Sequence, residues 1–431
     1  MIPTRIWRSA QAHFADPNTR LERGLTLAFV LAGLALRARG YLWDTRPLWL
    51  DEATWLQILV DPNFGDADLR PPGFMAVSGA LVQLFSASET VLRAVPWLAG
   101  VAVTLLAPPL GRRLFAGPAA RLLFVAVLAF QPAAIDLSKE FKPYSLSLAL
   151  HLALLLTVLR YLASLGARDL AVPLVIAVVG AFFSQDLVFA YPGVFLVLAG
   201  AAWSGRRKHL AAIAGAAAAT VAALLGQYIL IWSRIPKEES SYWAGKYSVF
   251  YSAESGVSYL DWLRERWSGV LGFPGMRRHF WEARSLSPAL LDGFRSVDGV
   301  VWVLFALGGL ALLCVRRRVT VLVLVALPYV VLWLFNALRF WPLGAFRTNL
   351  FTLVYTSALA AAAFDWRRES ARSPAWFTAA PACLLVVAPL LLFEKNWHAN
   401  KRAFAYDGHM PAALALLREA RAGEQHHRPE P

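Results

Sequence analysis

Residues 298–338 read DGVVWVLFALGGLALLCVRRRVTVLVLVALPYVVLWLFNAL, two long apolar runs separated by Arg316, Arg317 and Arg318. Each run is close to the roughly 20 apolar residues that an α-helix needs to cross the hydrocarbon core of a bilayer. Arginine and lysine are enriched in the cytoplasmic loops of membrane proteins. The stretch therefore predicts two antiparallel membrane helices with the three arginines on the cytoplasmic side.

The composition of the whole chain also indicates a membrane protein. Of its 431 residues 58% are hydrophobic and 16% are charged, whereas soluble domains have about 45–50% apolar and about 25% charged residues. The net charge of +14 resides largely in short loops between apolar runs, a distribution that argues against a nucleic-acid partner. Cys314 and Cys383 both fall in apolar runs and give no disulfide framework or zinc spacing.

Four short basic segments, 111–113, 206–208, 316–318 and 367–368, fix the orientation of the chain. We place them in the cytoplasm together with the N-terminus, where arginines before the run 24–36 predict an uncleaved signal anchor. The predicted fold class is all-α, a polytopic membrane protein with about 11 transmembrane helices. The predicted spans are 24–38, 91–110, 119–135, 144–162, 169–183, 187–203, 209–232, 298–315, 319–338, 350–364 and 374–393.

Two stretches of the first outer loop, 39–90, are not counted as spans. Span 24–38 leaves the cytoplasm and span 91–110 has to return to it, so the stretch 73–86 cannot cross. At about 14 residues it is also short for a crossing. We predict 73–86 and 49–60 as helices lying at the outer membrane surface. The other outer segments are 136–143, 233–297 and 339–349.

The acidic pair Asp51-Glu52 lies in the first outer loop, close to Trp49 and Trp55. Tryptophan anchors at the membrane interface, and a carboxylate partly shielded from water there can have a raised pKa and act as a general base. The alternative is an acidic first turn of an interfacial helix, which the helix dipole favours.

Basic residues in three outer segments are candidates for binding an anion. Arg70 follows Asp66 and Asp68 and precedes Pro71-Pro72-Gly73, which starts the surface helix; its guanidinium could meet a phosphate or could reach toward lipid headgroups. Arg347 lies on the outer side against the charge rule, which favours a phosphate partner.

The outer segment before span 144–162 contains Lys139, Glu140, Lys142 and Tyr144. Lys142 and Tyr144 could bind an anionic substrate, with Glu140 as a metal ligand or an orienting partner. The alternative is a solvated loop, which we favour for Lys139. His151, within that span, is more often a satisfied interior group than a ligand, and Asp186 in a tight outer turn is a weak candidate.

An acidic pair, a surface helix and outer cations thus lie on one side of the membrane, a set that suits displacement of a lipid phosphate by a nucleophile.

The chain resembles the GT-C superfamily of membrane glycosyltransferases, in its bacterial branch related to protein O-mannosyltransferases and aminoarabinose transferase. The resemblance is clear over about residues 40–200 and returns near 340–350. It is carried by the order of short motifs: Leu50-Asp51-Glu52-Ala53, Arg70-Pro71-Pro72-Gly73, Leu92-Arg93-Ala94-Val95-Pro96, Gly111-Arg112-Arg113-Leu114-Phe115, Glu140-Phe141-Lys142-Pro143-Tyr144-Ser145 and Pro342-Leu343-Gly344-Ala345-Phe346-Arg347-Thr348.

The resemblance implies a helical core, an extracytoplasmic active site and a polyprenyl-phosphate sugar donor. It implies that Asp51 is the catalytic base, with Glu52 beside it as a second catalytic candidate. Arg70 takes the place of the phosphate-binding cation, and we expect Lys142, Tyr144 and Arg347 to bind the same phosphate. Relatives often have an acid directly before that cation, where this chain has Leu69. Asp68 or Asp66 could substitute, and Glu140 and Asp68 are the candidates for a divalent metal such as Mg²⁺ or Mn²⁺.

On this interpretation residues 1–232 form the catalytic transmembrane core and 298–393 the C-terminal helices, with an extracytoplasmic tail at 394–431. The aromatic-rich loop 233–297 between them either shapes the acceptor site or caps the membrane surface.

The predicted function is transfer of a hexosyl or pentosyl group, with inversion, to a glycolipid, lipopolysaccharide, polysaccharide or protein at the outer face of a bacterial inner membrane. The alternatives are a transporter or flippase, for which no paired internal repeat is found, and a non-enzymatic assembly factor.

Overall fold

The computed structural model describes residues 17–43, 48, 50–60, 70–231, 233, 249–253, 256–271, 288–344 and 347–365. Within these ranges the side chains of 17–19, 50–51, 60 and 288–299 are not described. All regular secondary structure in the described part of the chain is helical, which confirms the predicted all-α class. The predicted span 374–393 and the tail 394–431 lie outside the described residues.

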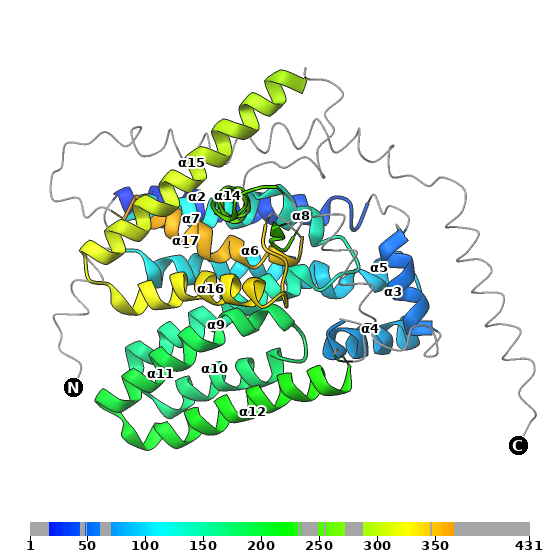
Figure 1. Ribbon diagram of the computed structural model, residues 1–431, viewed down its shortest axis with the longest axis horizontal. Helices are drawn as coiled ribbons and strands as arrows, with labels where there is room; N and C mark the ends of the chain where they lie inside the picture. The colour runs from blue at the N-terminus through cyan, green and yellow to red at the C-terminus, as the bar shows by residue number, and fades with distance from the viewer. Residues whose placement is uncertain are drawn as a thin grey trace, which may run out of the picture.

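In the part of the chain that the structure describes, ten longer helices form the bundle, and most of them run roughly side by side in Figure 1. Those long and apolar enough to cross a membrane are α6, α9, α16 and the segment 207–230 that contains α12; the number of crossings stays a prediction. The bundle helices are α2 (Pro17–Ala38), α6 (Ala94–Leu114), α7 (Pro118–Phe130), α9 (Tyr144–Ser164), α10 (Ala167–Gly180), α11 (Tyr191–Gly205), α12 (Leu210–Leu230), α15 (Pro288–Val315), α16 (Val319–Ala337) and α17 (Thr352–Ala362).

The shorter elements lie between these helices. They are α3 (Leu50–Val60), α4 (Pro72–Phe85), α5 (Glu89–Leu92), α8 (Pro132–Leu137), η1 (Gln185–Phe189), η2 (Arg207–His209), α14 (Tyr259–Leu271) and η5 (Arg347–Asn349). Several boundaries differ from prediction, among them the start of α2 at Pro17 where the span was predicted from 24. Helix α7 ends at Phe130 because Gln131 caps a separate helix that starts with Pro132, and α15 begins inside the predicted outer loop 233–297.

The two predicted surface helices are present as α3 and α4. They group with α5 at one end of the bundle (Figure 1) and share a small apolar core separate from the main one. Pro72 occupies the first turn of α4, as its fixed φ angle favours. The next residue, Gly73, donates its backbone N–H to the Phe182 carbonyl at 2.8 Å. A Cβ at this position would lie 2.9 Å from that same oxygen, so only glycine fits the contact.

Polar contacts gather the predicted cytoplasmic segments at one end of the bundle. Asp365, after α17, accepts a hydrogen bond from the Gly117 N–H at 2.7 Å and pairs with Arg318 at 3.0 Å. Arg318 also donates to the Leu114 carbonyl at 2.7 Å. The ends of α6, α15 and α17 and the starts of α7 and α16 therefore meet, as the positions of the basic loops predict.

Candidate active site

The candidate site lies where α3 and the segment before α4 meet the segment 138–143, which links α8 to α9. Its centre is the indole ring of Trp55 on α3. The Arg70 guanidinium carbon lies 4.9 Å from the ring centroid and the Lys142 Nζ lies 4.1 Å from it. Because both distances end at one centroid, the two charged centres are no more than about 9 Å apart.

Both cations are largely removed from water, with side chains 8% exposed for Arg70 and 4% exposed for Lys142. The Trp55 ring is held from the apolar side by edge contacts with Phe74 of α4 and Phe141, at 5.8 and 6.0 Å between centroids. A cation over an aromatic face gains roughly 0.5–2 kcal/mol, more where it is desolvated. The ring thus holds together two residues that were separately predicted to bind phosphate.

Glu52 is fully buried beside this ring and belongs to an ion pair. Its two carboxylate oxygens accept hydrogen bonds from Arg93 at 2.8 and 2.6 Å, and one of them also accepts from the Phe141 N–H at 2.6 Å. A carboxylate bound by an arginine fork and a backbone amide is strongly oriented. The geometry favours a positioning role for Glu52 over the catalytic role that its place beside Asp51 suggested.

Asp51 lies in the first turn of α3, and its neighbour Glu52 ties that turn to Arg93 and to the backbone of residue 141. The Asp51 side chain is not described, so its role as the base stays a prediction. Asp68 lies outside the described residues. Tyr144 is half-buried at the start of α9, one residue after the segment that carries Lys142.

Glu140 and Arg347 are brought together from distant parts of the chain. Arg347 Nη1 lies 3.6 Å from Glu140 Oε2, and Glu140 is the more buried partner. This arrangement suits Glu140 as the orienting partner of Arg347. Among the side chains that the structure describes, no three His, Cys, Asp or Glu residues gather closely enough to hold a metal ion. Asp68, one of the two predicted ligands, lies outside the described residues, and the metal stays a prediction.

Three side chains play parts that the sequence did not indicate. Trp55 had been interpreted only as an interfacial anchor, and Arg93 had been quoted only within a motif. The signal that could have found Arg93 is the one used for Arg347, a positive charge on the outer side of the membrane. Lys139 is buried and donates to the Leu36 and Arg39 carbonyls at 3.5 and 3.3 Å, where α2 ends.

The aromatic residues of loop 233–297 that are described pack onto the protein. Trp262 is buried and stacks with Tyr259 at 6.0 Å, and Trp267 contacts Tyr329 of α16 at 5.9 Å. Whether the loop shapes the acceptor site or caps the membrane surface stays a prediction. Trp243, Tyr247 and Trp281 lie outside the described residues.

Two solved proteins share this helical arrangement. The chain is similar over 83% of its length to ArnT from Cupriavidus metallidurans in the apo state, with a TM-score of 0.50 and 14% identity. It is similar over 89% of its length to the Archaeoglobus fulgidus oligosaccharyltransferase tethered with an acceptor peptide, with a TM-score of 0.51 and 14% identity.

This chain spans 62% of the ArnT chain and 56% of the oligosaccharyltransferase chain. A second ArnT structure, bound to undecaprenyl phosphate, has 16% identity and a TM-score of 0.47, too low to support an argument. No protein-family model and no curated protein matches the sequence. At these identities the likeness concerns the fold alone.

Proposed function

We propose that the chain transfers a sugar from a polyprenyl-phosphate donor to an acceptor on the outer side of the membrane. The observation that carries this proposal is the pair of buried cations, Arg70 and Lys142, over the Trp55 ring of the helix that also bears Asp51. Two cations held in a dry site suit a phosphate group, because charges interact more strongly away from water. The common class of the two solved proteins that share the fold supports glycosyl transfer.

In the proposed reaction the acceptor oxygen attacks the anomeric carbon of the sugar while the bond from that carbon to the phosphate oxygen breaks. The bonding electron pair goes to the leaving phosphate, where negative charge grows. Arg70 and Lys142, assisted by Tyr144 and Arg347, stabilise that charge. Asp51 takes the proton from the acceptor hydroxyl, a contribution of roughly 10²–10⁴-fold. Single displacement inverts the configuration at the anomeric carbon.

The buried ion pair between Glu52 and Arg93 contributes by fixing the start of α3. Since Glu52 also accepts the Phe141 N–H, it sets the position of α3 against the segment that carries Lys142. Asp51 and the two cations are then placed relative to one another before substrate binds. Such preorganised charges need no rearrangement during the reaction.

The acceptor is a glycolipid, lipopolysaccharide, polysaccharide or protein outside a bacterial inner membrane. The protein in nanodiscs, given radiolabelled polyprenyl-phosphate sugars and a membrane-lipid extract, tests the proposal. Wild type should move label to a new product, and Asp51→Asn should slow this step on the order of 10²–10⁴-fold.

Glu89→Gln is the matched control, since Glu89 is a partly buried carboxylate in the first turn of α5, near the same end of the bundle. It should leave transfer unchanged. Full activity in Asp51→Asn would remove Asp51 as the base. Carrier movement between leaflets without transfer to any acceptor would indicate a flippase instead.

A further inference from the structure

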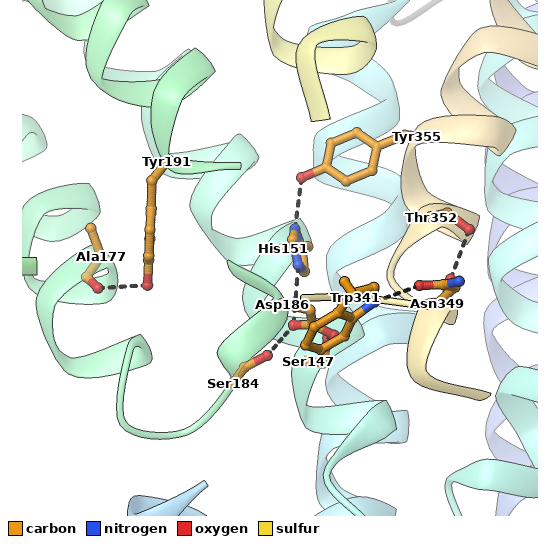
Figure 2. A network of polar contacts seen from close by, with 10 residues as sticks. All are labelled: Ser147, His151, Ala177, Ser184, Asp186, Tyr191, Trp341, Asn349, Thr352 and Tyr355. Carbon is orange, nitrogen blue, oxygen red and sulfur yellow. Dashed lines mark hydrogen bonds and ion pairs between the residues drawn. The ribbon is translucent and has the colours of Figure 1, made fainter. Parts of the chain in front are cut away.

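Figure 2 shows a chain of polar side chains within the buried part of the helix bundle. Asp186 of η1 accepts hydrogen bonds from the Ser184 hydroxyl and, at 2.5 Å, from the Ser147 hydroxyl of α9. Its carboxylate lies 3.5 Å from His151 Nε2. The other ring nitrogen of His151, Nδ1, shares a hydrogen bond of 2.7 Å with the Tyr355 hydroxyl of α17.

These polar groups lie among aromatic rings. The His151 ring, which is fully buried, stacks on Phe351 at 5.1 Å between centroids, and Phe351 stacks on Phe189 at 5.0 Å. Burying polar and ionisable groups in an apolar environment is costly unless they bond to one another. Within a membrane bundle such groups are by default candidates for function.

The elements that this network joins lie next to the predicted phosphate ligands. Helix α9 begins at Tyr144, two residues after Lys142, and α17 follows η5, which begins with Arg347. The turn before η1 is in turn bonded to α4 through the Gly73 N–H and the Phe182 carbonyl at 2.8 Å, three residues after Arg70. Arg70, Lys142 and Arg347 are therefore each linked to Asp186 through a short stretch of backbone and the polar contacts described above.

We propose that His151, Asp186 and Tyr355 are positioning residues that hold α9, η1 and α17 in register, so that the three cations converge on one phosphate. The proposal rests on the proposed function, because it assigns the network a purpose in binding the donor. Asp186 fixes α9 to η1 through Ser147, and His151 extends the connection to α17 through the Tyr355 hydroxyl. Removing the hydrogen bond between His151 and Tyr355 releases α17, which follows Arg347, from α9, which follows Lys142.

The sharpest test compares two buried tyrosines that each lose only a hydroxyl group. Tyr355→Phe breaks the bond to His151 and keeps the ring. Tyr329→Phe breaks a bond of 2.7 Å to Thr356, which joins α16 to α17, in a ring 6.3 Å from Tyr355 but outside the His151–Asp186 chain. A third variant, His151→Phe, removes the hydrogen bond to Tyr355 and keeps a ring stacked on Phe351.

For Tyr355→Phe and His151→Phe we expect the KM for the donor to rise on the order of 10–100-fold, because small misplacements of binding groups have effects of this size. The KM for the acceptor should not change, and Tyr329→Phe should match wild type in both. A variant that is merely less stable loses active protein, which lowers the apparent kcat and leaves the KM for the donor unchanged. Equal donor KM values in Tyr355→Phe and Tyr329→Phe would overturn the proposal.

A second readout does not depend on enzymatic activity. In a background with Cys314 and Cys383 replaced by serine, cysteines at positions 140 and 347 should be joined by a bifunctional thiol reagent long enough to replace the two lost side chains, since Arg347 Nη1 lies 3.6 Å from Glu140 Oε2. Adding Tyr355→Phe should abolish or strongly reduce this cross-link, and adding Tyr329→Phe should not.

The activity measurements and the cross-link test the proposed function and the positioning of the helices separately. Wild type that neither binds undecaprenyl phosphate nor transfers sugar would refute the proposed function, while loss of the cross-link in Tyr355→Phe alone would still support the positioning of the helices. An unchanged cross-link in Tyr355→Phe would refute that positioning even in an active enzyme.

Discussion

Arg93 and Glu52, which lie 41 residues apart in the chain, form a two-point ion pair with side chains 1% and 0% exposed. The pair joins the start of α6 to the first turn of α3, next to the predicted catalytic base. A buried pair of this kind contributes little net stability, but removing one partner leaves an uncompensated charge.

We therefore expect Glu52→Ala or Arg93→Ala to lower the free energy of unfolding by about 3–5 kcal/mol. The double replacement Glu52→Leu with Arg93→Met should recover much of that loss, because no unpaired charge remains buried. Unfolding in mixed detergent micelles measures these changes. Arg160→Ala is the control, since its pair with Asp169 is mostly exposed, with Arg160 62% exposed, and exposed pairs contribute roughly 0–1 kcal/mol. If Arg93→Ala and Arg160→Ala lowered the free energy of unfolding equally, the ion pair would not have the predicted effect.

The Trp55 ring gives a second prediction. Trp55→Ala removes the aromatic face beneath both Arg70 and Lys142, so the KM for the donor should rise at least on the order of tenfold, from cation–π terms of roughly 0.5–2 kcal/mol each. Trp55→Phe keeps a ring and should retain much of the affinity. Trp203→Ala removes an equivalent contact, with Arg207 at 4.9 Å, from the end of α11 predicted to face the cytoplasm. A rise in donor KM for Trp203→Ala as large as for Trp55→Ala would show that the effect is not local to the site.

Lys139 and Lys142 are three residues apart, both buried, and have different partners. Lys142→Met removes a charge from the Trp55 ring and should raise the donor KM with little change in thermal stability. Lys139→Met removes the bonds to the Leu36 and Arg39 carbonyls; it should lower thermal stability and leave the donor KM unchanged. Unfolding temperature and donor KM are measured on both variants. The unfolding temperature should fall in Lys139→Met, and the donor KM should rise in Lys142→Met. If both variants changed the same quantity, the separate roles of the two lysines would be wrong.

The orientation of the bundle can be tested by labelling from one side of the membrane. Thr90 and Ser204 are both exposed side chains, on α5 and α11. In a background with Cys314 and Cys383 replaced by serine, a cysteine at 90 should react with an impermeant thiol reagent in intact spheroplasts. A cysteine at 204 should react only after permeabilisation. The reverse pattern would invert the predicted topology and place the candidate site in the cytoplasm.

Local sequence features predicted the helices well. The surface helix expected at 73–86 is α4, Pro72–Phe85, because a proline at the first turn and an apolar run define it without help from the rest of the chain. The turns that hold the basic segments 111–113 and 316–318 meet as predicted, because charge patterning records which helix ends share a side of the membrane.

The internal contacts of the site could not be predicted in this way. Trp55 lies 15 residues before Arg70 and 87 before Lys142, and no local pattern indicates that one ring serves both. Glu52 looked like a second catalytic acid because its partner, Arg93, is distant in sequence. His151 was expected to be a satisfied interior group, and it is one, but its partner is a tyrosine 204 residues away that no local pattern identifies.

The backbone contact at Gly73 has a consequence for how the protein responds to its lipids. Membranes differ in hydrocarbon thickness by several ångströms, and a protein meets this mismatch by tilting, by moving flanking residues or by deforming the bilayer. Helix α4 has little freedom to shift, because its first turn is bonded through main-chain atoms to the turn before η1. The depth of Arg70 is therefore set by the protein. In a thinner or thicker membrane we expect the surrounding lipid to deform around α4 while the distance from Arg70 to the bundle stays constant.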